Sequence, residues 1–201
     1  MTAQTPATRF RADPTGPGPV FAMLAAMWAV FVAEVVLPVD LTRWGLRAHD
    51  IHAWYGILTM PFLHVGLAHI VGNSLPFLVL GIFVCWHGHR TFWRVIGWAM
   101  VLGGVFAWLF TPAGTVVVGA SGLVFALFAF LVARPLLPGH SSWKRVLADV
   151  LVALAVIVVY GGAMVSGILA AGPSVSWQGH LGGALGGVVA AWSTSRSRDD
   201  S

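Results

Sequence analysis

Charged residues are scarce in this chain, and their scarcity decides its class. Only 9% of the 201 residues are Asp, Glu, Lys or Arg, whereas soluble domains carry about 25%. Hydrophobic side chains make up 58% of the chain, and its mean hydropathy is +0.84. So few charges could not cover the surface of a water-soluble globule. The composition therefore excludes a soluble enzyme and an intrinsically disordered chain, and it predicts a polytopic membrane protein in one domain.

Cysteine and clustered positive charge are also missing. A single cysteine, Cys85, excludes an intramolecular disulfide framework. The 11 basic residues exceed the 7 acidic ones only slightly and form no stripe that could follow phosphates, so we expect no nucleic-acid partner. Cys85, His87 and His89 (CWHGH) form a possible metal site. We expect them instead at the inner membrane interface, and we predict neither a metal nor another cofactor.

Apolar segments take up most of the chain. A transmembrane helix needs about 20 predominantly apolar residues, and six segments meet or approach that length. We expect an all-α bundle of six transmembrane helices over residues 20–194. The polar residues 1–19 predict a disordered cytoplasmic tail, and residues 195–201 predict a short cytoplasmic tail. The predicted helices cover residues 20–39, 68–86, 92–110, 121–137, 146–166 and 178–194.

Lys and Arg lie mainly on one side of the predicted helices. With the N-terminus in the cytoplasm, nine of these residues are cytoplasmic and two, Arg43 and Arg47, are outside. This bias places both termini in the cytoplasm. The external segment 40–67 is amphipathic and carries Trp44 and Trp54, so we expect it to lie in the membrane interface. Ten Arg against one Lys indicates a GC-rich bacterial genome, and hence a bacterial plasma membrane.

Polar residues at membrane depth stand out because they are costly there. Asn73, Ser121 and His180 come from three different predicted helices. At 1.5 Å per residue, each lies about 20–24 Å from the inner end of its helix. The three therefore share one level, about a third of the way in from the outer face of a core about 30 Å thick. An amide, a hydroxyl and an imidazole at one level predict a functional site that opens to the extracytoplasmic side.

A serine and a histidine at one depth, with no acid beside them, suggest a nucleophile and its general base. Glycine-rich, non-helical backbone (TPAGTVVVGASG) leads into the predicted helix at Ser121. The first N–H groups of that helix are free to bind an oxyanion. On the helix of His180, Gly179, Gly183 and Gly187 recur every four residues and form a smooth face. This face allows the close approach that a hydrogen bond between Ser121 and His180 requires.

Together these residues resemble the rhomboid family of intramembrane serine proteases. Residues 119–122 (Gly-Ala-Ser-Gly) match the family's GxSG motif, and His180 within GHLGG matches its catalytic histidine. His69 and Asn73, inside FLHVGLAHIVGN, match its HxxxN motif. The segment WYGILTMPFLH matches the family's external loop, so the resemblance covers about residues 20–192.

The resemblance implies a fold and a role for each residue. The fold would be the six-helix rhomboid bundle, with an interfacial loop after the first helix and a re-entrant loop before the fourth. Ser121 would be the nucleophile and His180 the general base, in a dyad without an acid. Side chains and backbone N–H groups would form the oxyanion hole: Asn73, His69, Ser121 and Gly122.

Two positions depart from the family pattern. Gly56 follows Trp54 and Tyr55 where the family often has Arg, which puts the anchoring of the loop in doubt. Phe125 stands where the family commonly stacks a tyrosine on the catalytic imidazole, so the stacking would be kept without the hydroxyl. Phe125 and Gly119 are thus predicted to support the site.

The implied substrates are transmembrane segments of other proteins. A helix shields its carbonyls with its own hydrogen bonds, so these segments should carry helix-weakening residues near the cleaved bond. The lipid bilayer is the other expected partner. Because water must reach the site, the helix at 146–166 and the loop at 167–177 are candidates for a mobile lid.

Other interpretations are open. A catalytically inactive rhomboid-like protein would keep the fold and bind or retain membrane clients without needing Ser121 or His180. A small transporter would use His69, His180 and Glu34 as a proton relay. Glu34 is also a candidate third catalytic residue, although a bond to the external loop is its simpler role. His64 is expected to be structural.

Overall fold

The computed structural model describes residues 14–140, 142–169, 172 and 175–199, and it is predominantly helical. Six of its helices coincide, within a few residues at each end, with the six apolar segments predicted from the sequence. In the described part of the chain, four of them are long and apolar enough to cross a membrane, namely α1, α3, α4 and α6, while α5 is shorter. These helices are α1 (Gly18–Val36), α3 (Leu67–Cys85), α4 (His89–Phe110), α5 (Ser121–Ala133), α6 (Trp143–Leu169) and α7 (Trp177–Asp199).

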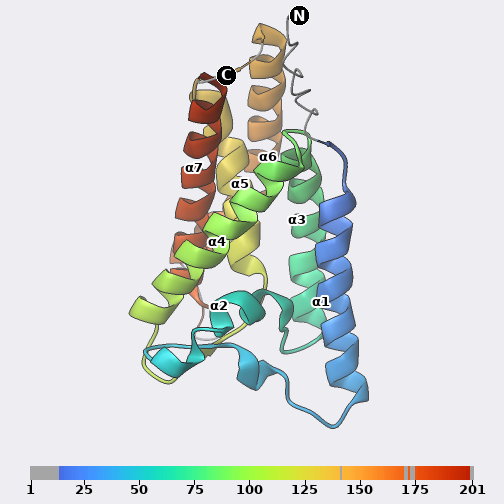
Figure 1. Ribbon diagram of the computed structural model, residues 1–201, viewed down its shortest axis with the longest axis vertical. Helices are drawn as coiled ribbons and strands as arrows, with labels where there is room; N and C mark the ends of the chain where they lie inside the picture. The colour runs from blue at the N-terminus through green and yellow to red at the C-terminus, as the bar shows by residue number, and fades with distance from the viewer. Residues whose placement is uncertain (1–13, 141, 170–171, 173–174, 200–201) are drawn as a thin grey trace, which may run out of the picture.

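The segment between α1 and α3 lies across one end of the bundle (Figure 1). Its short strand β1 (Leu46–Arg47) pairs antiparallel with β2 (Val116–Val117), which lies in the stretch that leads into α5. Backbone hydrogen bonds between β1 and β2 therefore join the segment after α1 to the stretch that leads into Ser121. The other elements of this segment are η1 (Thr42–Trp44), η2 (Ile51–Ala53), α2 (Gly56–Thr59) and η3 (Met60–Phe62).

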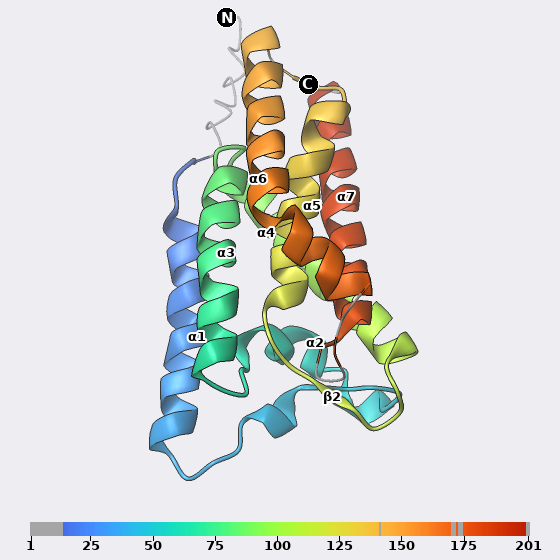
Figure 2. The same ribbon diagram turned by 180° about the vertical axis from the view of Figure 1, so that it is seen from behind.

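Helix α5 lies at the centre of the bundle, as both ribbon views show (Figures 1 and 2). Its sequence, SGLVFALFAFLVA, is apolar on every face, which is typical of a helix surrounded by others. It contacts α3, α4, α6 and α7, and its Leu127 and Phe130 are fully buried. Because Ser121 is the first residue of α5, this burial holds the serine in a fixed place.

Helix α7 packs on α5 through the glycine face seen in the sequence. A Cβ atom at Gly183 would collide with the carbonyl of Gly122, and one at Gly187 would collide with the carbonyl of Ala126. The two backbones are thus in direct contact over more than one turn. This contact brings the start of α7, where His180 lies, beside the start of α5.

A second glycine face of α7, which the sequence analysis missed, packs on α4. A Cβ at Gly186 would lie 2.7 Å from the carbonyl oxygen of Trp98, and one at Gly182 would collide with that of Leu102. The paired glycines of GHLGGALGG therefore serve two neighbours, one residue of each pair facing α5 and the other facing α4. Any larger side chain on either face would push α7 out of place.

The far end of the bundle, which we define as the end opposite the segment between α1 and α3, contains a buried cluster of one acidic side chain and two histidines. Asp149 on α6 lies 3.6 Å from Nε2 of His87 and 3.2 Å from Nε2 of His140. Their side chains are at most 9% exposed. His87 is predicted from the sequence to lie at the inner membrane interface, and in the structure its ring also contacts α6 through Asp149.

The residues just before α1 are also held at the far end. The backbone N–H of His89 donates to the carbonyl of Pro14 at 2.9 Å, and a ring nitrogen of His89 lies 3.0 Å from that of Gly16. Residues 1–13 of the predicted tail lie outside the described part. Cys85 is buried, and no metal-binding cluster is found among the described residues, so the CWHGH motif is divided among separate contacts.

Candidate active site

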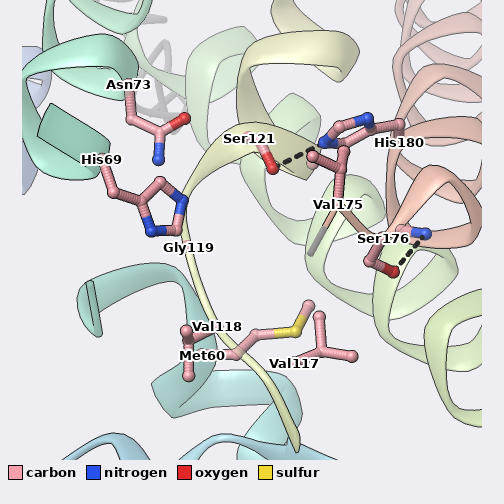
Figure 3. A pocket seen from close by; sticks show the side chains of 12 residues that line it. Met60, His69, Asn73, Val117, Val118, Gly119, Ser121, Val175, Ser176 and His180 are labelled. Atoms are coloured by element: carbon pink, nitrogen blue, oxygen red, sulfur yellow. Dashed lines mark hydrogen bonds between the residues drawn. The ribbon is translucent and has the colours of Figure 1, made fainter. Parts of the chain in front are cut away.

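Ser121 and His180 meet where the first turns of α5 and α7 lie side by side. The serine Oγ lies 2.7 Å from Nε2 of His180, although 59 residues separate them in sequence. Figure 3 shows this contact as a dashed line across the cavity. The distance falls within the range for a nucleophile and its base. The glycine contact between α7 and α5 makes so short a separation possible.

The other side of the His180 ring is held by two groups. Nδ1 lies 2.8 Å from the carbonyl oxygen of Gly167, near the end of α6. A carbonyl can only accept a hydrogen bond, so Nδ1 carries the proton, and Nε2 keeps a lone pair for the serine hydroxyl. Phe125 stacks on the imidazole with ring centroids 4.1 Å apart and planes 9° apart. The stacking position was identified from the sequence, but the carbonyl was not.

A cavity of about 200 Å³ adjoins the serine. Figure 3 shows Asn73 and His69 on one side, His180 on the other and Ser121 between them. Asn73 Nδ2 and His69 Nδ1 are buried and have no hydrogen-bond partner among the described residues. Buried polar atoms without a partner are costly. An oxygen that enters the cavity can satisfy Asn73 Nδ2, and Figure 3 shows that the His69 ring nitrogen on the side of Gly119 and Ser121 is Nε2. Gly122 and Gly179 also line it.

Gly119 gives the backbone before Ser121 its shape. Its φ of +113° lies in a region that side chains disfavour. A Cβ there would also lie 2.6 Å from Nε2 of His69. Its N–H donates to the carbonyl of Met60 at 2.8 Å, which ties this stretch to η3. Both the positive φ and the lack of space beside His69 therefore favour glycine at the first position of the GxSG motif.

Other predicted residues lie away from the cavity. Glu34 is not among its lining residues, so the structure does not assemble Glu34, His69 and His180 into one relay. One oxygen of Glu34 is buried without a partner among the described residues, so the expected bond to the loop is not seen. His64 is 1% exposed and packs edge-on against His69, with ring centroids 5.0 Å apart. Burial lowers the pKa of His64 to about 4.

Gly56, which replaces the expected arginine, lies where no side chain fits. A Cβ there would collide with the backbone of Leu46 in β1. The loop is anchored to α4 by other residues. Trp108 Nε1 donates to the carbonyl of Asp50 at 3.2 Å, and a ring nitrogen of His49 lies 3.0 Å from the carbonyl of Leu109. The doubt about loop anchoring is thus resolved by contacts that lie outside the family motif.

A comparison with known proteins agrees with this arrangement. A family profile described as the Rhomboid domain matches residues 52–197, most of the chain. The chain belongs to the rhomboid family. This confirms the resemblance seen in the sequence. Together with its apolar helices, it makes the protein an integral membrane protein of a family whose members are generally serine intramembrane proteases.

Several relatives of this rhomboid share much of its length. An uncharacterized protein of Mycobacterium tuberculosis is 32% identical over 199 residues, covering 94% of this chain and 80% of its own. Rhomboid-like protein 11, chloroplastic, of Arabidopsis thaliana is 32% identical over 74% of this chain and 55% of its own. Rhomboid protease GluP of Bacillus subtilis is 28% identical over 75% of this chain, but over only 29% of its own length.

One further residue at this rhomboid's site was missed in the sequence. Ser176 lines the cavity and caps α7, because its Oγ accepts the N–H of Gly179 at 3.2 Å. Its carbonyl accepts the N–H of His180 at 3.1 Å. A serine just before a predicted helix is a typical N-cap, so this signal was available. The cap fixes the turn of α7 that carries the imidazole.

Proposed function

We propose that this rhomboid is an intramembrane serine endopeptidase that uses Ser121 and His180 as a catalytic dyad. The observation that carries the proposal is the 2.7 Å separation between Ser121 Oγ and His180 Nε2. Two further features support it: the Nδ1–H tautomer set by the Gly167 carbonyl, and the unpartnered Asn73 Nδ2 across the cavity, beside the His69 ring. No cofactor is required.

The reaction follows from these positions. Ser121 Oγ attacks the carbonyl carbon of a substrate peptide bond while His180 Nε2 takes the hydroxyl proton. The carbonyl oxygen becomes an oxyanion, which Asn73 Nδ2, His69 and the first N–H groups of α5 stabilise. The tetrahedral intermediate collapses, the imidazolium gives its proton to the leaving amine, and an ester to Ser121 remains. Water, deprotonated by the same imidazole, then hydrolyses this ester and frees the serine.

The proposed topology has six transmembrane helices, α1 and α3 to α7, in a membrane domain over residues 20–194. Both ends of the described chain lie at the far end of the bundle, opposite the segment between α1 and α3 (Figure 1). The excess of Lys and Arg assigned to that side supports a cytoplasmic location for it. The segment between α1 and α3 would then lie in the outer interface, with the site opening to the extracytoplasmic side of a bacterial plasma membrane.

The proposed substrates are transmembrane segments with helix-weakening residues near the cleaved bond. An intact helix keeps its carbonyls hydrogen-bonded, so the segment must unwind before Ser121 can reach one. Val175 and Ser176 line the cavity, and Gly167 contacts His180, so the end of α6 and residues 175–176 border the site, while residues 170–171 and 173–174 of the predicted lid lie outside the described part. These elements are the proposed lid for substrate and water.

Cleavage of a model transmembrane substrate in proteoliposomes tests the proposal. We expect Ser121→Ala and His180→Ala each to lower the cleavage rate about 10³-fold or more. Matched controls are Ser166→Ala, whose hydroxyl bonds only to its own helix at Ala163, and the exposed His52→Ala. Cleavage that persists in Ser121→Ala would overturn the mechanism. Client binding without cleavage by the wild type would favour the inactive rhomboid-like alternative.

A further inference from the structure

Three helix ends meet at His180. The imidazole lies in the first turn of α7, its Nε2 contacts the first residue of α5, and its Nδ1 contacts the last turn of α6. The two N-terminal ends and the one C-terminal end carry opposite partial charges. His180 therefore lies between groups that act on its proton in opposite directions.

The two N-terminal ends favour negative charge. This helps Ser121, where an alkoxide and then an oxyanion develop. The same field disfavours a proton on His180, which must become an imidazolium during the reaction. The dyad has no carboxylate to compensate, since no Asp or Glu lines the cavity or contacts the imidazole among the described residues.

The end of α6 provides the missing compensation. Gly167 is the third residue from the end of α6, which is Leu169, so its carbonyl belongs to the last turn of the helix. Carbonyls in the last turn of a helix form the negative end of its dipole. The Gly167 oxygen, 2.8 Å from Nδ1, is thus a hydrogen-bond acceptor whose field favours the imidazolium.

The residue at this place must be glycine for the contact to form. A Cβ at Gly167 would lie 2.8 Å from Cζ of Phe125 and 3.3 Å from Nδ1 of His180. A Cβ at Gly162, on the same helix, would meet nothing within 4 Å. Close approach of α6 to the stacked pair of Phe125 and His180 therefore depends on Gly167 in particular.

We propose that the backbone carbonyl of Gly167 is the positioning group that completes the Ser121–His180 pair. This inference rests on the proposed function. The carbonyl holds the imidazole in the Nδ1–H tautomer, aims Nε2 at the serine, and stabilises the proton that His180 receives. As a consequence, the base acts only when α6 is seated against it. The helix that borders the cavity thereby controls the chemistry as well as access.

A purely structural role for Gly167 makes a different prediction. If the glycine only packs α6, its replacement lowers stability and changes substrate entry, and hence KM. If its carbonyl orients the base, replacement lowers kcat and the intrinsic reactivity of Ser121 while KM is retained. A small fluorophosphonate, which needs no transmembrane substrate, reports that reactivity directly.

The first experiment compares Gly167→Ala with Gly162→Ala in the full chain, in proteoliposomes. We expect Gly167→Ala to lower kcat and the rate of fluorophosphonate labelling about tenfold or more, with KM changed less than about twofold. Gly162→Ala should match the wild type. If the wild type cleaves, Ser121→Ala does not, and Gly167→Ala matches Gly162→Ala, then this inference alone is overturned. A wild type that neither cleaves nor labels overturns the proposed function as well.

The second experiment weakens the carbonyl without changing a side chain. Replacing Ile168 by its α-hydroxy acid turns the peptide bond after Gly167 into an ester, whose carbonyl is a poorer acceptor. The same replacement at Ile157, in the middle of α6, removes one helix N–H in the same way and is the control. We expect a fall of about fivefold in kcat and labelling for the ester at 168 relative to that at 157. Equal rates for the two esters would contradict the role of the carbonyl.

Discussion

The two ends of the bundle both hold histidines in buried contacts, but they pair them differently. At the far end, His87 and His140 both contact the carboxylate of Asp149. At the other end, His180 has a neutral carbonyl on Nδ1, a serine hydroxyl on Nε2 and a cavity beside it.

This difference separates a structural tie from a reactive site. A carboxylate between two histidines joins two loops to α6, and all three side chains are at most 9% exposed. A histidine aimed at a hydroxyl activates that hydroxyl, and Asn73 Nδ2 across the cavity has no hydrogen-bond partner among the described residues. In this chain, the two histidines that contact a carboxylate therefore hold loops in place, whereas the histidine that contacts the serine hydroxyl borders the cavity.

The strongest way to break this comparison is to remove a donor at the reactive end. We expect Asn73→Ala to lower kcat/KM about 10²- to 10³-fold, the usual cost of losing one oxyanion donor. The matched control is the adjacent Ser74→Ala, which loses the hydrogen bond from Trp28 Nε1 at 3.1 Å but leaves the cavity intact. Kinetics and thermal unfolding of both variants check this. Equal kcat/KM values would show that Asn73 is structural.

The next test concerns His64, a buried histidine that packs against His69 but does not line the cavity. His64 lies in the segment before α3, and burial lowers its pKa from 6.5 to about 4. The unfolded chain therefore binds this proton more readily. The contribution of neutral His64 to the free energy of unfolding is therefore complete above pH 6.5. It declines as the pH falls towards 4, by about 3 kcal/mol at most. Unfolding in micelles from pH 7.5 to 4.5 should show a shallower decline for His64→Gln than for the wild type. Identical pH slopes would contradict this assignment.

A smaller effect is expected at the far end. Asp149→Asn replaces the buried carboxylate that contacts His87 and His140, and we expect it to lower the free energy of unfolding by about 2 kcal/mol. The folded protein should keep kcat within about twofold, because the cluster is not part of the chemistry. Asp40→Asn, in an exposed turn beside Thr42, is the control and should change neither quantity. A large loss of kcat without loss of stability would show that the cluster at the far end contributes to catalysis.

The smallest expected effect concerns the ring that stacks on His180. Phe125→Leu removes an aromatic contact worth about 1 kcal/mol, so we expect kcat to fall about fivefold. Phe128→Leu, on the same helix but without the imidazole contact, should lose comparable stability and keep kcat. Steady-state kinetics alongside thermal unfolding distinguish the two. A fall in kcat of similar size in both variants would reduce the stacking to general packing.

Much of the site was predictable because its residues carry local signals. Ser121 and His180 stand out against an apolar background, and the glycine period behind His180 indicates a close helix contact. The positions of the six helices followed from the lengths and hydropathy of the predicted segments, although α7 is not among those found long and apolar enough to cross a membrane in the described part of the chain. These features depend on neighbouring residues or on a helical period, which a single sequence displays.

The remainder depends on contacts between distant segments. The Gly167 carbonyl belongs to the backbone and has no side-chain signature, and β1 and β2 pair across some 70 residues. His140 and Asp149 meet only because the loop between α5 and α6 turns back on itself. The second glycine face is also visible in the sequence, as glycine pairs at 182–183 and 186–187. Because one glycine in every four residues already explains a contact with one helix, the sequence alone does not single out the contact with α4.

The most direct test of the account is to locate the adduct of a fluorophosphonate by mass spectrometry in wild type and in His180→Ala. Only a serine whose proton is taken by a neighbouring base should react at a useful rate. The account predicts a single phosphonylated residue, Ser121, in the wild type and none in His180→Ala, with both proteins folded. Labelling at another residue, or unchanged labelling of Ser121 without His180, would contradict it.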